Sequence, residues 1–206
     1  MAVSSTRFDD SRYLSKMFLF LILFVFNSFL ISPFIAWYDS GELIGTTVCL
    51  GISHPSGQSL FHLLGKCFLL WPWGTAAFKV GLMSVFCAAM ASVLFFDLSC
   101  KLAVRFSISG KISKELKTWL IFLTLGWSWS LPWWRYSLTP LVYALHLLMA
   151  MLVIWALSLE KPWKWNLALF IVGAATVLRP TQFFVMPFWY GHRPVIRMPR
   201  YGEHSG

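Results

Sequence analysis

The sequence has few charged residues, and acidic residues are especially scarce. Charged residues make up 12% of the 206 positions, and only eight are Asp or Glu, whereas an average soluble domain is about a quarter charged. Hydrophobic residues make up 58%, including 19 Phe and 12 Trp, and the mean hydropathy is +0.67. A water-soluble globule of this size cannot hide so much apolar surface, whereas lipid accepts it. The composition predicts a polytopic integral membrane protein.

Several motifs are also missing. There is no H-x-x-H or H-E-x-x-H pattern, so no zinc site is expected. The four cysteines lack C-x-x-C spacing and are interpreted as small hydrophobic residues. The net charge is +9, but no basic stripe with interleaved aromatics follows any polar segment, so no nucleic-acid partner is expected.

Five apolar stretches are long enough to cross a bilayer, which takes about 20 residues. They predict an all-α membrane bundle forming a single domain over 1–206, with an outer loop at 38–75. The first stretch exceeds a usual signal-peptide core, and Phe34 is too bulky for a cleavage site after Ala36, which favours an uncleaved signal anchor. The predicted spans are about 17–37, 76–98, 118–134, 138–159 and 166–190.

The basic residues predict a cytoplasmic N-terminus, because Lys and Arg accumulate in cytoplasmic segments. The basic C-terminal tail would then lie outside, against this rule. Either a further span is missing, or residues 181–190 turn back and the tail is cytoplasmic. The predicted cytoplasmic segments contain Arg7, Arg12, Lys16, Lys101, Arg105, Lys111, Lys114, Lys117, Lys161 and Lys164.

Two of the acidic residues, Asp39 and Glu42, follow the first span, whereas the other six are in tails or flank span ends. Their spacing is typical of a capping box, in which each side chain binds a backbone N–H at a helix start. A cap at a membrane surface also holds a carboxylate where a substrate hydroxyl can reach it, so a general-base role is compatible with this interpretation.

Further along the outer loop, Pro55 and Gly57 disfavour a continuous helix. After them the polar residues Gln58, His62 and Lys66 recur every four positions among apolar ones. This pattern predicts an interfacial helix whose polar stripe faces water or a headgroup, ending at Trp71-Pro72-Trp73-Gly74 in the aromatic belt. On spacing alone, His54 is a turn residue or a base. Lys66 either snorkels or contacts a lipid phosphate.

Two arginines are candidate phosphate ligands, because the planar guanidinium binds phosphate through two donors. Arg179 lies within the fifth predicted span, where a charge is costly and usually faces a partner or a polar cavity. Arg135 follows Trp133 and Trp134 near the outer interface, where a charged side chain costs less free energy than it does within a span.

The stretch Asp39-Ser40-Gly41-Glu42-Leu43, then Leu50-Gly51-Ile52-Ser53-His54-Pro55-Ser56-Gly57, then Leu64-Gly65-Lys66, resembles the opening of a family of multispanning membrane proteins first catalogued as a domain of unknown function. That family belongs with the GT-C glycosyltransferases and includes the animal O-mannosyltransferase acting on plexin-type receptor domains. The similarity continues through Tyr143-Ala144-Leu145 and covers most of residues 17–190.

The chain departs from the family pattern in three ways. Leu141 stands where the family often has Glu before Val-Tyr, and Ser56 replaces the second proline of the turn. Relatives also carry more spans and often a soluble C-terminal region. The chain therefore resembles an N-terminal portion, either a truncated product or a variant completed by another subunit.

The resemblance implies a GT-C-like fold and inverting transfer of a sugar from a polyprenyl-phosphate carrier to an acceptor hydroxyl on the non-cytoplasmic face. Asp39 matches the family's essential acidic residue and is assigned as general base, with Glu42 orienting the acceptor or supporting Asp39. The expected substrate-binding residues are His54, Lys66, Arg135, Tyr143 and Arg179. No metal motif is visible, although a divalent ion held by Asp39, Glu42 and the donor phosphate is compatible with the sequence.

The expected partners are membrane lipid, the lipid-linked sugar and a protein or glycan acceptor, together with a partner subunit if the chain is incomplete. A bacterial inner membrane is favoured over the endoplasmic reticulum. The main alternative is an inactive or accessory membrane subunit, a remnant of such a transferase. A small transporter is disfavoured because no predicted span before the fifth has a central charge.

Overall fold

The protein is described by a computed structural model over residues 3–35, 39–53, 58–107 and 112–176, with side chains from residue 13 onward. This part of the chain is all-helical and contains no strand, as the sequence predicts. The helices are α1 (Val3–Ser28), α2 (Ser40–Cys49), α3 (Ser59–Leu69), α4 (Ala76–Phe106), α5 (Lys114–Ser128), α6 (Leu131–Leu138), α7 (Tyr143–Leu157) and α8 (Lys164–Thr176).

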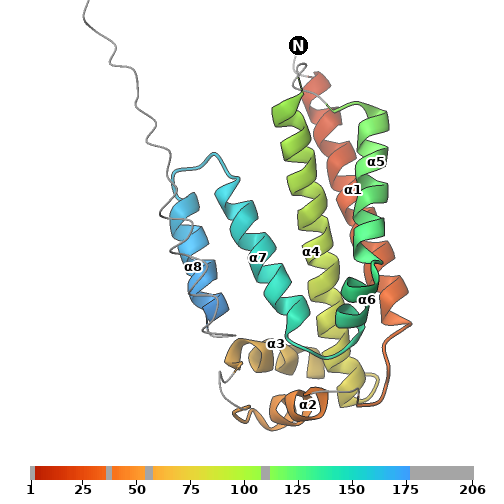
Figure 1. The fold of residues 1–206 in the computed structure, drawn as a ribbon, viewed down its shortest axis with the longest axis vertical. Helices are drawn as coiled ribbons and strands as arrows, with labels where there is room; N and C mark the ends of the chain where they lie inside the picture. The colour runs from red at the N-terminus through yellow and green to blue at the C-terminus, as the bar shows by residue number, and fades with distance from the viewer. Residues whose placement is uncertain (1–2, 36–38, 54–57, 108–111, 177–206) are drawn as a thin grey trace, which may run out of the picture.

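The long helix α4 is the centre of the fold. It packs against α1, α5, α6 and α7 along its length and against α3 near its start, and α8 packs on α7 (Figure 1). Its buried face is rich in small residues, among them Gly81, Ala88 and Ala91, which let neighbouring helices approach closely. A β-carbon at Gly81 would lie only 2.7 Å from the side chain of Ile31, so this glycine admits the segment that follows α1.

The two short helices α2 and α3 form a hairpin across one end of the bundle, which we call the hairpin end (Figure 1). The predicted outer loop at 38–75 is thus helical over much of its length. Leu43 and Ile44 on α2 and Phe61 on α3 are buried in one cluster with Val80 of α4 and Leu141. Apolar burial therefore seats the hairpin on the start of α4 and on the residues that precede α7.

The predicted spans are matched unevenly by the helices. Within the described residues, α4 is the one helix long and apolar enough to cross a membrane by itself, while α6 and α7 pass this test together as a pair bent by 113°. The apolar part of α1, Tyr13–Ser28, and helix α5 are both shorter than the roughly 20 residues that a span needs. The five-span arrangement therefore stays a prediction. The predicted fifth span extends beyond the described residues.

The break between α6 and α7 has a local cause in the sequence. Pro140 follows Thr139, and the residue before a proline is disfavoured in the helical conformation. Thr139 is accordingly extended, with φ −100° and ψ 142°. A second proline, Pro132, stands at the start of α6, where it costs no helical hydrogen bond. The prolines therefore separate a short helix from α7 at the hairpin end.

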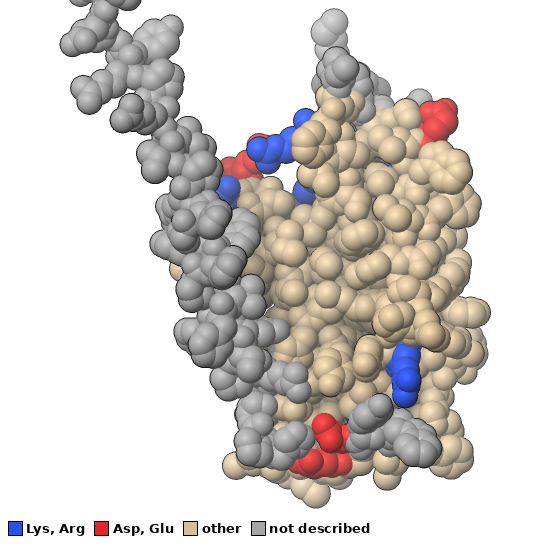
Figure 2. Space-filling view, in the orientation of Figure 1, with Lys and Arg blue, Asp and Glu red and all other residues tan. Residues whose placement is uncertain are grey.

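The charged side chains lie toward the two ends of the bundle, and a tan, uncharged surface covers much of the face in Figure 2. We call the end opposite the hairpin the basic end. It receives the C-terminus of α4, the start of α5 and the turn between α7 and α8 (Figure 1). The basic residues of these segments are Lys101, Arg105, Lys114, Lys117, Lys161 and Lys164, whereas the hairpin end has Lys66, Lys79 and Arg135.

Candidate functional site at the hairpin end

The two candidate catalytic carboxylates are exposed on the first turn of α2. Asp39 is the N-cap residue of this helix, as the spacing predicts, and Glu42 lies one turn later. The predicted capping hydrogen bond from Asp39 is wrong, because its side chain accepts none from the helix. The physical reason is its backbone, at φ −72° and ψ 4°, which is not the extended conformation that aims an N-cap side chain at the helix amides. The Asp39 carboxylate is therefore not committed to the helix start.

His62 on α3 is buried, and the predicted exposure of its polar stripe is wrong. His62 and Gln58 are each 3% exposed, and His62 faces α2, whereas Lys66 stays partly exposed. The imidazole Nδ1 lies 2.9 Å from Thr47 Oγ1 of α2, and Nε2 lies 3.1 Å from Ser53 Oγ. The pKa of His62 is lowered from its ordinary value by burial, with the charge of Glu42 acting in the opposite direction.

The glycine of the Leu64-Gly65-Lys66 motif lies where α2 and α3 meet. A β-carbon at Gly65 would lie 2.7 Å from Thr47 Cγ2, closer than real β-carbons approach, so a side chain here would push the helices apart. Lys66 follows directly and donates a hydrogen bond from Nζ to the carbonyl oxygen of Val48, at 2.6 Å. Lys66 thus binds one of the carbonyls left unpaired at the C-terminus of α2.

Both ends of the segment between α2 and α3 have left-handed backbone conformations. Leu50 has φ 51° and Gln58 has φ 42°, and these are the two positive-φ residues other than glycine in the described chain. This conformation costs an L-residue roughly 1–2 kcal/mol and often marks a functional segment. His54 lies outside the described residues, between these two positions.

The remaining predicted substrate-binding residues are at the bend between α6 and α7 or beyond the described chain. Arg135 on α6 is exposed. Tyr143 begins α7, is 44% exposed, and places its ring 4.8 Å from that of Tyr136 on α6. Both helices reach the hairpin end (Figure 1). Arg179 lies outside the described residues.

Leu141, where the resemblance leads us to expect glutamate in relatives, is 5% exposed and packs in the same cluster as Leu43 and Phe61. In this chain the position therefore contributes apolar packing beneath α2 and not a polar group. Within the described residues, no group of three His, Cys, Asp or Glu side chains is arranged to hold a metal ion.

A polar cluster at the basic end was not predicted. Asp97, which the sequence places in a bland position flanking a span, is 6% exposed and forms ion pairs with Lys16 of α1 and Lys101 of α4. Trp155 of α7 donates to the same carboxylate at 3.1 Å. The four-residue spacing of Asp97 and Lys101 indicates one of these pairs. The contributions of α1 and α7 have no signal in the sequence.

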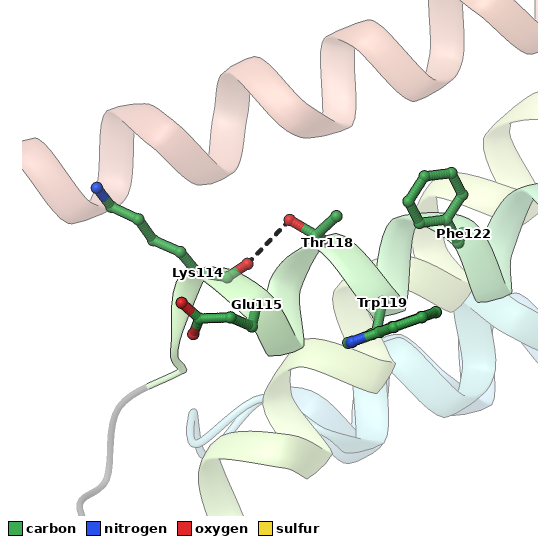
Figure 3. Close-up of a pocket in the computed structure, with 5 residues that line it drawn as sticks. All are labelled: Lys114, Glu115, Thr118, Trp119 and Phe122. Atoms are coloured by element: carbon green, nitrogen blue, oxygen red, sulfur yellow. Dashed lines mark hydrogen bonds between the residues drawn. The ribbon is translucent and has the colours of Figure 1, made fainter.

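The basic end also has a shallow surface pocket along α5 (Figure 3). One helix supplies its whole lining, and Thr118 Oγ1 in it donates to the carbonyl oxygen of Lys114 at 3.0 Å. Trp119 and Phe122 beside it are 70% and 61% exposed. The pocket contains none of the predicted site residues and is lined by Lys114, Glu115, Thr118, Trp119 and Phe122.

The comparisons with known proteins agree on one family. The chain matches the family described as the protein O-mannosyl-transferase TMEM260 N-terminal domain over residues 39–190. It is 36% identical over 119 residues to the protein O-mannosyl-transferase TMEM260 of Mus musculus, and this match covers 56% of the chain and 16% of the mouse protein. No solved structure matches the chain.

Proposed function

Because this chain belongs to the TMEM260 N-terminal domain family, we propose that it provides the part of a GT-C-type glycosyltransferase that binds the acceptor. The proposed reaction transfers a sugar from a polyprenyl-phosphate carrier to a hydroxyl of a protein, and mannose is the first sugar to test. One observation supports this proposal above the others: the family match begins at Asp39, and Asp39 and Glu42 are exposed on a short helix that buried contacts seat on the bundle.

The chemistry requires a carboxylate to accept the proton of the attacking hydroxyl and cations to stabilise the phosphate that leaves. Asp39 is the general base in this proposal, because its carboxylate does not bind the helix start. Glu42, one turn later, orients the acceptor. Arg135 is the stronger phosphate ligand among the described cations, because Lys66 already donates to Val48 whereas Arg135 is exposed on α6.

The proposed membrane arrangement is multi-pass, with the hairpin end on the non-cytoplasmic face and the N-terminus in the cytoplasm. The charge distribution supports it, because basic residues of the C-terminus of α4, the start of α5 and the turn between α7 and α8 lie at the opposite end (Figure 1). Such clustering is typical of the cytoplasmic side of membrane proteins. A test places a reporter within residues 39–73 and measures its modification in whole cells. Modification only from outside supports this orientation, and modification only from inside contradicts it.

The function is tested by transfer of radiolabelled mannose from polyprenyl-phosphate mannose to membrane protein, catalysed by the purified chain. Carriers of bacterial and of eukaryotic length are both supplied, because the bacterial inner membrane is an expectation from sequence alone. Asp39→Asn is expected to lower transfer by about 10² to 10⁴, the usual contribution of general-base catalysis. Glu160→Gln, at the basic end, is the matched control. Equal turnover by wild type and Asp39→Asn would contradict the assignment.

A second candidate function is an accessory subunit without transferase activity of its own. The burial of Leu141 in the apolar cluster favours it, since the family's usual carboxylate is absent at this position. Donor binding without transfer, together with one stoichiometric partner recovered in detergent, would support the accessory function. Transfer by the purified chain alone would exclude it.

A further inference from the structure

The hydrogen bonds around His62 define which of its nitrogens has the proton. The hydroxyl of Thr47 donates its one proton to the carbonyl oxygen of Leu43, at 2.6 Å. In the 2.9 Å contact with Nδ1, the hydroxyl oxygen must therefore accept, so Nδ1 is the protonated nitrogen. Burial favours the neutral imidazole, which leaves Nε2 as the acceptor of the Ser53 hydroxyl at 3.1 Å.

This one ring connects three parts of the hairpin. Thr47 belongs to the last turns of α2, Ser53 follows the left-handed residue Leu50 that ends α2, and His62 itself lies on α3. Thr47 and His62 are nearly inaccessible, at 0% and 3% exposure, so water cannot replace either partner. Removal of one partner would leave a buried polar group unpaired, which costs more than the hydrogen bond contributes.

The first turn of α2 is held by a backbone hydrogen bond and by the burial of Ser40 and Leu43. Asp39 supplies no side-chain cap, and the turn that contains it is closed by the Leu43 amide, which donates to the Asp39 carbonyl oxygen at 2.9 Å. The carbonyl oxygen of Leu43 in turn accepts the Thr47 hydroxyl. A continuous chain of hydrogen bonds thus runs from His62 through Thr47 and Leu43 to Asp39.

We propose that His62 is a positioning residue of the acceptor site, and that its neutral Nδ1–H form holds α2 in the orientation that presents Asp39 and Glu42 at the surface. The catalytic part of this inference rests on the proposed function, whereas the positioning part does not. His62 does not touch the reacting atoms. It acts through Thr47 and the short helix that contains both carboxylates.

The test is amide hydrogen exchange of the full chain in nanodiscs, which needs no transfer activity. The reporter is the Leu43 amide, because its exchange requires opening of the turn at Asp39. Thr47→Val keeps the volume and removes the acceptor, and Ser53→Ala removes the second partner. Both are expected to speed Leu43 exchange by about five- to a hundredfold, the effect of leaving a buried group unpaired. Thr118→Val on α5, which loses a similar hydroxyl bond at an exposed position, is the control.

Two results would overturn the proposal. One is faster exchange confined to residues 47–53 with Leu43 unchanged, because α2 would then keep its orientation without His62. The other is a proton on Nε2, with Nδ1 unprotonated, in ¹⁵N spectra of the His-labelled chain.

His62→Asn keeps a donor near the Nδ1 position and is expected to retain part of the protection of the Leu43 amide. This variant separates the positioning role from a general loss of packing. Where transfer is measurable, Thr47→Val should lower kcat with little change in KM. If Asp39→Asn leaves transfer intact, only the catalytic part fails.

Discussion

The indole N–H of Trp155 on α7 donates a hydrogen bond to Oδ2 of Asp97 on α4 at 3.1 Å, and this contact joins the two helices at the basic end. Lys101 strengthens the same junction, because its ammonium lies 3.1 Å from Asp97, donates to Ser158 at 3.0 Å and sits 5.1 Å from the centre of the Trp155 ring. With the ion pair from Lys16, three helices of distant sequence position meet at one buried carboxylate.

Asp97→Asn is expected to lower the free energy of unfolding by roughly 2 kcal/mol. Breaking a buried ion pair costs about 3–5 kcal/mol, and solvent reduces this because both lysines are partly exposed. Thermal unfolding in detergent measures the loss, with the exposed Glu160→Gln as control. An unchanged midpoint in Asp97→Asn would mean that the ion pairs contribute nothing to helix association.

Gly65→Ala is expected to destabilise the hairpin by about 1–3 kcal/mol, because the new methyl group would overlap Thr47 Cγ2. The double variant Gly65→Ala/Thr47→Ser removes the overlapping methyl and keeps the hydroxyl that His62 binds, so it should recover most of the loss. Gly45→Ala is the matched control on α2, since nothing lies within 4 Å of its added carbon. Equal losses in the single and double variants would refute a steric cause.

The stability of the chain should depend on pH through His62. Its pKa is lowered on folding, so the unfolded chain binds more protons as the pH falls below about 6.5. The stabilisation from neutral His62 is complete above that pH and is lost progressively as the pH decreases toward the folded pKa. Midpoints of thermal unfolding from pH 7 to 5 should therefore fall less steeply in His62→Asn than in wild type. Parallel curves would show that another group dominates.

Leu141→Glu introduces the residue that the resemblance leads us to expect in relatives. It should lower the yield of folded protein, because it places a carboxyl group in the cluster of Leu43 and Phe61. Leu141→Met preserves volume and polarity and should cost less than about 1.5 kcal/mol. Size-exclusion profiles and thermal unfolding in detergent compare the two. Normal folding of Leu141→Glu with increased transfer would instead show that this site still accepts the family's carboxylate.

The sequence by itself determined the helical class, the place of Asp39 at a helix start and the family. These features depend on composition and on residues close together in the chain, so they are visible without coordinates. The break between α6 and α7 was not predicted, because the predicted span 138–159 ran through Pro140. A helix after Gly57 was predicted from four-residue spacing and is observed as α3, but its environment was not predicted. That pattern indicates that Gln58, His62 and Lys66 share one face of the helix. It does not predict which part of the protein packs against that face.

Only the tertiary structure decided that this face meets α2 and not water. Because Gly65 has no side chain, α2 approaches α3 closely there, and Thr47 lies within hydrogen-bond distance of His62. It likewise decided the role of Asp97, whose partners Lys16 and Trp155 are 81 positions before and 58 positions after it in the chain. Burying a polar group is costly unless a matching donor or acceptor faces it. Which residues supply these partners depends on how helices pack, and that is a property of the whole fold.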